Sequence, residues 1–492
     1  MPPTLELVGR PPISIESAIE EERNVINWAS YGPATDKLYQ GLWEQRASIE
    51  ALVKHHLALG KRDTCIVLPP SHWIRGSFNI CVFVEVNSNN PYRKVIFRCP
   101  MPHKLAEARY PGSIDEKVSC EIGASIWVEE KCLEIRSPSL FGFGFSDGRH
   151  FTHTNHMPFF SRIVRLFWRS IYKFLRLPLL SHYVWNPPAS HQMLSDSFDA
   201  HRDDETRRRR LFRGMSRILP SLARIPQAQI GSFQFHNDGT VTLTNRPLSC
   251  WMMILENDGA AKTIQRGTTF SCTDAFVSDM LTFHDHRFLS QPNAVYSESD
   301  CQGQMAVKTL LRVLSHVYIE RELRNGPFLL QLTDFHASNV LVDKHWNVTG
   351  LIDLEWICAL PSEMLEVPCW LTGCAIDQIK GETLDRFDQA RQEFMRVFKE
   401  EEQATKAKHN ITLSKVMQDT WESKGVWFWH CLSSVNAMYY LLETHMYPPK
   451  SLSTEAEKCL SRFWCRDSED VVQKKMADKQ AYDDQVRKMF CE

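Results

Sequence analysis

Four polar side chains between residues 328 and 356 have the types and spacing that phosphoryl transfer needs. Asp334, His336 and Asn339 lie between two short apolar runs, and Asp353 follows a third such run. A polar stretch of turn length separates the second run from the third, so the pattern predicts a small β-hairpin. We expect the loop that enters this hairpin and the end of its second strand to bring two carboxylates and one amide together.

The chemistry of these groups suits transfer of a phosphoryl group from ATP. In such a reaction the protein orients a hydroxyl group and holds a metal ion on the nucleotide phosphates. Because Mg²⁺ takes oxygen ligands and keeps much of its water, Asn339 and Asp353 are sufficient as its protein ligands. Asp334 is the candidate catalytic base, which accepts the proton of the attacking hydroxyl group. A competing interpretation is a metal hydrolase built from Asp334, His336, Asp353 and Glu355.

Residues 334–339, with the sequence Asp-Phe-His-Ala-Ser-Asn, and residues 352–355, Ile-Asp-Leu-Glu, resemble two motifs of a known family. They are similar to the catalytic loop and the metal-binding aspartate of the aminoglycoside phosphotransferase and choline kinase-like family, and more specifically to large fungal proteins with that domain. The family's loop usually reads His-Gly-Asp-Leu-His-Pro-Gly-Asn. Here Leu332 and Thr333 stand at the His-Gly positions and Ala-Ser replaces Pro-Gly, while the aspartate, second histidine and asparagine keep their spacing.

The resemblance implies an α+β protein with a two-lobed, protein kinase-like fold, in which a small lobe with an antiparallel sheet faces a larger, mostly helical lobe. It also implies ATP and Mg²⁺ as cofactors and a hydroxylated small molecule as the acceptor substrate. The expected division of the chain is an N-terminal helical extension (1–60), the small lobe (61–150), an insertion with a basic amphipathic helix and a linker (151–190), the large lobe (191–470) and a charged tail (471–492).

Strand-like runs between residues 65 and 98 predict the antiparallel sheet of the small lobe. By the resemblance, the turn that covers the nucleotide phosphates consists of Gly76, Ser77 and Phe78. An ordinary β-meander with no ligand is the alternative interpretation of these runs.

A helix is predicted over residues 114–130, directly after the sheet. Arg98 stands where a lysine usually contacts the phosphates in the family, and its guanidinium keeps the positive charge and adds a fork of donors. By the resemblance, Glu121 on the helix is the partner that positions Arg98. The alternative is a glutamate on a solvated helix face.

A hydrophobic hinge strand, which bonds the adenine ring in kinase-like folds, is not evident in the sequence. It is shortened, replaced by residues 141–145, or missing. Residues 158–177 instead predict a basic, aromatic helix that would make weak contact with an anionic membrane surface, or else a partly buried helix with a solvated basic face. The missing hinge strand and Leu332 favour a second hypothesis for the function, a catalytically weak or inactive kinase-like binding or regulatory protein.

In the second half of the chain, alternating residues predict a β-hairpin over 230–245. His284 and Asp285 are adjacent and polar, but we expect them to pack or to cap a helix rather than to form a catalytic pair. The aromatic cluster within residues 427–440 is expected to be core, with a substrate pocket as the alternative.

Both ends of the chain predict helices. Apolar residues recur at helical spacing over 16–29 and 42–59, and the second of these runs ends at Gly60. The charged stretch after Asp467 predicts a final, exposed helix.

The bulk composition excludes little and favours a cytoplasmic protein. With 57 basic and 59 acidic side chains in 492 residues, the near-neutral chain gives no reason to expect nucleic acid as a partner. The 15 cysteines are scattered singly and the polar start lacks a signal peptide, so we expect reduced thiols in the cytoplasm. No apolar run reaches the roughly 20 residues that cross a bilayer. Oligomeric state and acceptor remain undetermined by the sequence.

Overall fold

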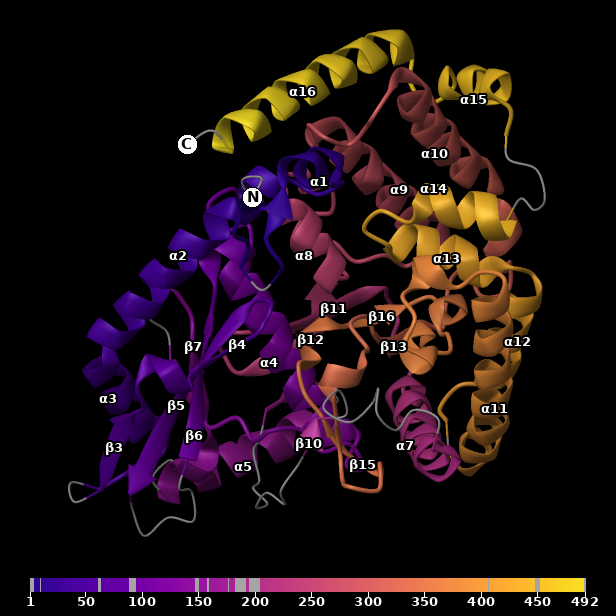
Figure 1. Ribbon diagram of the computed structural model, residues 1–492. Helices are drawn as coiled ribbons and strands as arrows, with labels where there is room; N and C mark the ends of the chain where they lie inside the picture. Colours follow the sequence, from indigo (N-terminus) through magenta and orange to yellow (C-terminus); the bar gives the residue numbers. More distant parts are fainter. Residues whose placement is uncertain are drawn as a thin grey trace.

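The structure is a computed structural model of the 492-residue chain. It describes residues 4–8, 10–60, 63–87, 94–146, 150–156, 159–175, 177–181, 192–193, 204–405, 407–446 and 452–490. The protein is a mixed α/β structure that is mostly helical and contains several small antiparallel sheets (Figure 1).

The described strands are short. They are β1 (Thr4–Leu5), β2 (Ile13–Ser14), β3 (Thr64–Val67), β4 (Ile74–Arg75), β5 (Asn79–Asn87), β6 (Lys94–Pro100), β7 (Gly142–Gly144), β8 (His150–Thr152), β9 (Leu179–Leu180), β10 (Gln192–Met193), β11 (Gly231–Phe235), β12 (Thr240–Asn245), β13 (Leu329–Leu332), β14 (Val340–Val342), β15 (Val348–Leu351) and β16 (Ile357–Leu360).

The described α-helices occupy more of the chain. They are α1 (Ile15–Glu20), α2 (Val25–Glu44), α3 (Arg46–His56), α4 (Ser113–Lys131), α5 (Phe159–Phe174), α7 (Glu205–Ala223), α8 (Cys250–Asn257), α9 (Thr273–Ser290), α10 (Glu298–Tyr318), α11 (Glu382–Ala404), α12 (Leu413–Glu422), α13 (Gly425–Ser433), α14 (Met438–Leu441), α15 (Thr454–Ser461) and α16 (Ser468–Met489). Among the described residues, no helix is both long and apolar enough to cross a membrane.

The first sheet contains β3, β4, β5 and β6, and all of its pairings are antiparallel. Along β5 the side chains of Ile80, Val82, Val84 and Val86 are buried, which is the period-2 pattern of a half-buried strand. They pack with residues of α3 in a core of their own. The strands predicted between residues 65 and 98 are therefore confirmed, and Figure 1 shows α2 and α3 beside this sheet.

The helices predicted near the N terminus have the wrong boundaries. Residues 30–41, which were not expected to be helical, belong to the single helix α2, and Pro33 lies inside it. Glycine and proline both disfavour the interior of a helix, and the pair Gly32-Pro33 lies within α2. The buried side chains of Trp28 and Tyr31 nevertheless keep this segment packed, so tertiary contacts override the local signal.

A second sheet has the strand order β13, β16, β11, β12, β9 and passes through the largest core of the protein. The hairpin predicted over 230–245 is confirmed as β11 and β12, and its turn ends at Gly239, whose φ of +81° suits glycine. Helix α4 lies against β11. A Cβ atom at Gly123 would lie 2.8 Å from Cβ of Phe233, so the absence of a side chain there permits this close approach.

Helix α4, which was predicted over 114–130, is confirmed and is fixed by a buried cluster of charges. Nε of Arg246 lies 2.6 Å from Glu116 on α4, and Nη1 lies 2.5 Å from Glu256 on α8. All three side chains are nearly or fully buried. Burial alone would raise the pKa of Glu116, but Arg246 lowers it to about 2. The cluster therefore stays ionised and ties α4 to the second sheet.

Two arginines of helix α5 face the body of the protein. Arg165 donates to the backbone oxygen of Gly239 and to Oγ of Ser181, both at 3.3 Å. Arg169 donates to Glu130 at 2.7 Å and to the backbone oxygen of Leu180. The predicted helix is thus present, but the expectation of a buried apolar side and a solvated basic side is wrong for these two arginines.

The C-terminal helix α16 is packed rather than exposed. Figure 1 shows it across α1 and α10, and the backbone N–H of Val25 donates to the hydroxyl of Tyr482 at 2.9 Å. Lys475, Tyr482 and Val486 are buried. The expectation of an exposed helix is wrong. It came from the many charged residues after Asp467, although one side of this helix is buried.

Replacing Arg246 by Met should destabilise the fold by about 3–5 kcal/mol, because the buried Glu256 would lose its ion pair and Glu116 would keep only Lys262 and Arg266. The matched control is Arg217→Met, which removes an ion pair between an arginine that is 61% exposed and Glu401, and should cost less than about 1 kcal/mol. Urea unfolding followed by circular dichroism measures both. Equal losses for the two variants would contradict the assignment of the buried cluster as the anchor of α4.

Candidate functional site

The loop between β13 and β14 carries the predicted catalytic residues. Asp334 and His336 precede a short 3-10 helix, Ala337–Asn339, and His336 Nε2 lies 3.4 Å from Asp334 Oδ1. The side-chain nitrogen of Asn339 donates to the backbone oxygen of Asp334 at 2.9 Å. No hydrogen bond from a described residue reaches the side-chain oxygen of Asn339. The loop therefore holds the amide with its oxygen available to a ligand.

Asp353 follows the second strand of the hairpin. Strands β14 and β15 form the predicted pair, and the N–H of Ile352 donates to the backbone oxygen of Asn339 at 3.1 Å. Asp353 itself has φ +58° and ψ +54°, a left-handed conformation that is uncommon for residues other than glycine. This backbone turn ends the strand and aims the chain into the 3-10 helix Leu354–Trp356.

Arg98 on β6 joins this hairpin to α4. Its Nη1 atom lies 2.5 Å from Oε1 of Glu121, and its Nη2 atom lies 2.6 Å from Oδ1 of Asp353 and 3.2 Å from Oε1 of Glu355. The Asn79 amide is oriented with its oxygen towards Arg98. This oxygen accepts hydrogen bonds from Nε of Arg98 at 3.1 Å and from Nη2 of Arg98 at 2.8 Å. The structure thus brings together Arg98 and Glu121, as expected, and places Asp353 with them.

Lys117 is part of the same cluster, and the sequence reasoning missed it. Its side chain is fully buried, and Nζ lies 2.9 Å from Glu355 and 3.2 Å from Glu121. A signal was present, because Lys117 and Glu121 are four residues apart and so share one face of α4. Glu355 had been considered only as a metal ligand of a hydrolase. Here it is buried as well, and it accepts from Lys117.

The cluster holds more negative than positive charge. Three carboxylates, those of Glu121, Asp353 and Glu355, surround the two basic groups of Arg98 and Lys117. Burial and the charge of Glu355 raise the pKa of Asp353 to about 6, although Arg98 acts in the opposite direction. The pKa of Glu355 is lowered, because Lys117 and Arg98 outweigh its burial. A cation near Asp353 would therefore relieve an existing repulsion.

Charges in the loop and in this cluster shift the pKa of the same neighbouring groups. The pKa of His336 is raised by its hydrogen bond to Asp334, against the effect of burial, and the charges of both Asp334 and Asp353 contribute. Burial and the charges of Asp334 and Glu355 likewise raise the pKa of Cys250. Asp334 and the Asp353–Glu355 pair therefore lie near enough to act on common neighbours.

The turn predicted to cover phosphates is present between β4 and β5, but its residues differ in exposure. Gly76 and Ser77 are exposed, and the N–H of Gly76 donates to the backbone oxygen of Asn79 at 2.9 Å. The side chain of Phe78 is buried and meets the ring of Trp356 edge to face, with centroids 5.4 Å apart. The side chain of Phe78 is therefore part of the core, and its backbone oxygen accepts from the N–H of Met101 at 2.7 Å.

The metal hydrolase interpretation receives no support from the described residues. No group of three or more His, Cys, Asp or Glu side chains among them is arranged to hold a metal ion. Glu355, one of its proposed ligands, is instead committed to Lys117 and Arg98.

The segment considered as a substitute for the hinge strand forms a small separate hairpin. Strand β7 pairs with β8, and Phe143 packs on Phe151 and Phe235. Within the described residues these two strands form a sheet of their own. The linker at 182–190 and residues 194–203 lie outside the described residues.

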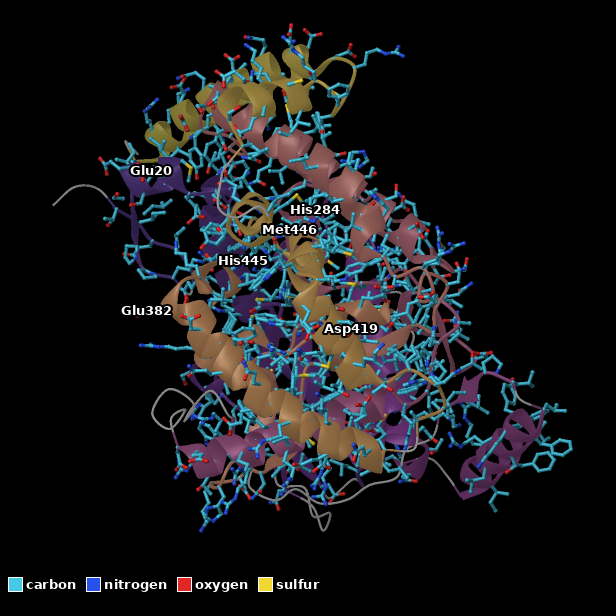
Figure 2. The ribbon with its side chains drawn as sticks, turned by 90° about the vertical axis from the view of Figure 1, so that its right-hand side faces the viewer. Glu20, His284, Glu382, Asp419, His445 and Met446 are labelled. Atoms are coloured by element: carbon cyan, nitrogen blue, oxygen red, sulfur yellow. The ribbon has the colours of Figure 1, made fainter. Side chains whose placement is uncertain are left out.

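His284 and Asp285 make packing contacts and hydrogen bonds inside the protein, as expected. The His284 ring stacks on Trp251, and its Nε2–H donates to the backbone oxygen of Leu432 at 2.9 Å. Asp285 accepts from Arg312 and, at 2.7 Å, from Nε1 of Trp464. Figure 2 shows His284 inside the helical part of the molecule.

The aromatic cluster of residues 427–440 is mainly core, as expected. Trp427, Phe428 and Trp429 are buried, and His445 stacks on Trp427. Figure 2 places His445 in the same helical part of the molecule as His284. The cluster therefore supplies mainly packing for the helices, and Trp427 also lines a small cavity together with Trp421 and His430.

Comparison of the chain with protein-family models, with curated proteins and with solved structures finds no match.

Replacing His284 by Gln should make the protein less sensitive to acid. Burial lowers the pKa of His284 to about 3, despite its hydrogen bond to Leu432. The unfolded chain takes up a proton below about pH 6.5 and the folded chain does not, so stability is lost as the pH falls through this range. The contribution at pH 5 is on the order of 2 kcal/mol.

The measurement is the urea-unfolding free energy at pH 7 and pH 5 for the wild type, His284→Gln and the control His316→Gln, whose histidine is exposed. We expect the loss between the two pH values to be smaller only in His284→Gln. An unchanged loss in that variant would show that other groups determine the acid sensitivity.

Proposed function

We propose that the protein transfers the γ-phosphate of ATP to a hydroxyl group of a small molecule, with a two-lobed kinase-like arrangement of the aminoglycoside phosphotransferase and choline kinase type. The observation that carries the proposal is the contact of Arg98 with Glu121 and Asp353, at 2.5 and 2.6 Å. Through this contact Arg98 connects β6, α4 and the β14–β15 hairpin. The resemblance implies that these elements carry the phosphate-contacting residue (Arg98), its partner (Glu121) and a metal ligand (Asp353).

Each side chain has a role that its surroundings support. Asp334 accepts the proton of the acceptor hydroxyl group, a role for which a carboxylate within hydrogen-bond reach is sufficient. Asn339 and Asp353 are suited to hold Mg²⁺, because one offers an amide oxygen with no donor from the described residues and the other lies in a site with excess negative charge. When bound, Mg²⁺ would neutralise the charge of the ATP phosphates.

Arg98 and Glu121 are proposed to position the phosphates. The guanidinium is held by Glu121, Asp353, Glu355 and Asn79. A phosphate oxygen would therefore have to replace one of these partners. Asp353 is the partner that can leave at least cost, because it is 37% exposed whereas Glu355 is 2% exposed, and a metal ion would take its carboxylate.

The same observation supports the second candidate, a kinase-like binding or regulatory protein with weak or no activity. A guanidinium with this many partners binds phosphate only if the contacts rearrange. Leu332, at the position of the family's first histidine, adds to this alternative. The two candidates differ in turnover, which the second experiment below measures.

We also infer a cytoplasmic location. The 14 cysteines within the described ranges are free thiols, as expected in a reducing compartment. The inference concerns the compartment of the reaction and leaves the acceptor open.

ATP with Mg²⁺ should raise the melting temperature of the protein. A ligand at 100 times its Kd stabilises the folded state by about 2.7 kcal/mol. ATP without Mg²⁺ should give a smaller shift, since the phosphates would then meet the carboxylates of Asp353 and Glu355 without a cation between them. Absence of any shift at millimolar ATP would overturn the enzyme hypothesis.

Asp334→Asn should abolish phosphoryl transfer while leaving the ATP-dependent thermal shift intact, because the carboxylate acts on the acceptor rather than on the nucleotide. Labelled ATP and a panel of hydroxylated metabolites and aminoglycosides measure the transfer. The matched control is Asp377→Asn, an exposed aspartate in a separate 3-10 helix, which should retain full turnover. Undiminished transfer by Asp334→Asn would refute the assigned base, and transfer by neither the wild type nor the control would favour the binding protein.

A further inference from the structure

Helix α5 and the residues after it carry an unusual share of the exposed apolar side chains. Fifteen large hydrophobic side chains are exposed among the described residues, and seven of them lie within residues 163–177. Single exposed hydrophobic residues are normal on protein surfaces, whereas a contiguous group marks an interaction site. The concentration on one short segment therefore indicates a partner.

Four of the five large hydrophobic side chains exposed on α5 share one face of the helix, and Trp168 lies outside that face. Ile163, Leu166, Phe167 and Phe174 are 47%, 48%, 61% and 85% exposed, and they follow one another at intervals of three, one and seven residues. Together with the exposed Ser170 they make a stripe at the i, i+3, i+4, i+7 and i+11 positions. Such a stripe normally faces a core, but here it faces outward.

The contacts of α5 with the protein body fix this orientation. Arg165 and Arg169 bind the turn at Gly239, the strand end at Ser181 and the carboxylate of Glu130 from the opposite side of the helix. A rotation that buried Phe167 would break these charge-assisted hydrogen bonds. The outward apolar face is therefore held by the fold.

The charge around the stripe limits the choice of partner. Between Asp147 and Asp196 the sequence has no acidic residue and has six basic residues: Arg149, Arg162, Arg165, Arg169, Lys173 and Arg176. Lys173 is exposed beside the stripe. An apolar helix face within a segment of one charge sign complements a surface that is both apolar and anionic.

We propose that α5 docks the protein on an anionic lipid bilayer, with Phe167, Phe174 and Leu166 inserted at the level of the headgroups and Lys173 among the lipid phosphates. The proposal is independent of the phosphotransferase function. A second copy of the chain is a poorer occupant of this face, because two acid-free basic segments would repel each other across the interface.

The test is co-sedimentation of the full-length protein with vesicles of phosphatidylcholine alone and of phosphatidylcholine with about a third phosphatidylserine. The wild type should bind the anionic vesicles, and high salt should weaken the binding. The double variant Phe167→Ser with Phe174→Ser should lower the partition coefficient by at least about tenfold, since both rings lose their apolar contact with lipid. The control Phe463→Ser, a phenylalanine that is 74% exposed on a different segment, should bind as the wild type does.

Three results would overturn the proposal. The first is equal binding of the double variant and the wild type, with both folded by circular dichroism. The second is absence of wild-type binding, or equal binding to neutral and anionic vesicles. The third is a wild-type dimer in light scattering that the double variant dissociates, which would make a second copy the occupant of this face.

Discussion

The guanidinium of Arg98 holds together three segments that are distant in the sequence. It lies on a strand of the first sheet, and its partners are Glu121 on α4 and the Asp353–Glu355 pair after the β14–β15 hairpin. Partly buried carboxylates at these distances repel one another unless a cation lies between them. Arg98 and the fully buried Lys117 supply this positive charge. The three carboxylates of the candidate site therefore stay close together only when both basic side chains are present.

Helix α4 is the element through which the fold supports this site. One part of the helix bears Lys117 and Glu121, while Glu116 is held in the buried cluster with Arg246 and Glu256. Gly123 allows the helix to lie close to β11. A change far from the candidate site, at Arg246, would therefore be transmitted through α4 to the residues that hold Arg98.

Much of the local structure was predictable, because it depends on periodicity. Alternation identified the strands between residues 65 and 98 and the hairpin β11–β12, and helical spacing identified α4. The pairing of Arg98 with Glu121 was expected from a family resemblance rather than from spacing. Lys117 was missed because a lysine on a helix ordinarily lies in water, and its burial arises only when Glu355 arrives from more than 200 residues away.

The sequence-based predictions that were wrong failed because tertiary contacts changed the local structure or the side of an element that is buried. The sequence predicted separate helices over 16–29 and 42–59, but packing keeps α2 continuous through Pro33. For α5 the sequence specified an amphipathic helix without specifying which side faces the protein, and backbone oxygens near Gly239 and Leu180 attract the arginines inward. Phe78 was assigned to a ligand-covering turn, yet Trp356 supplies it with a core contact.

The most direct test of the central claim, that Asp353 beside Arg98 forms a metal and nucleotide-phosphate site, is the binding of Mn²⁺ in the presence of ATP, followed by electron paramagnetic resonance of the free ion. Asp353→Asn should weaken the binding by at least about tenfold, since the ion loses a carboxylate ligand. The control Asp484→Asn, which changes an exposed aspartate on α16, should leave it unchanged. Equal affinity of Asp353→Asn and the wild type for Mn²⁺ with ATP would contradict the account.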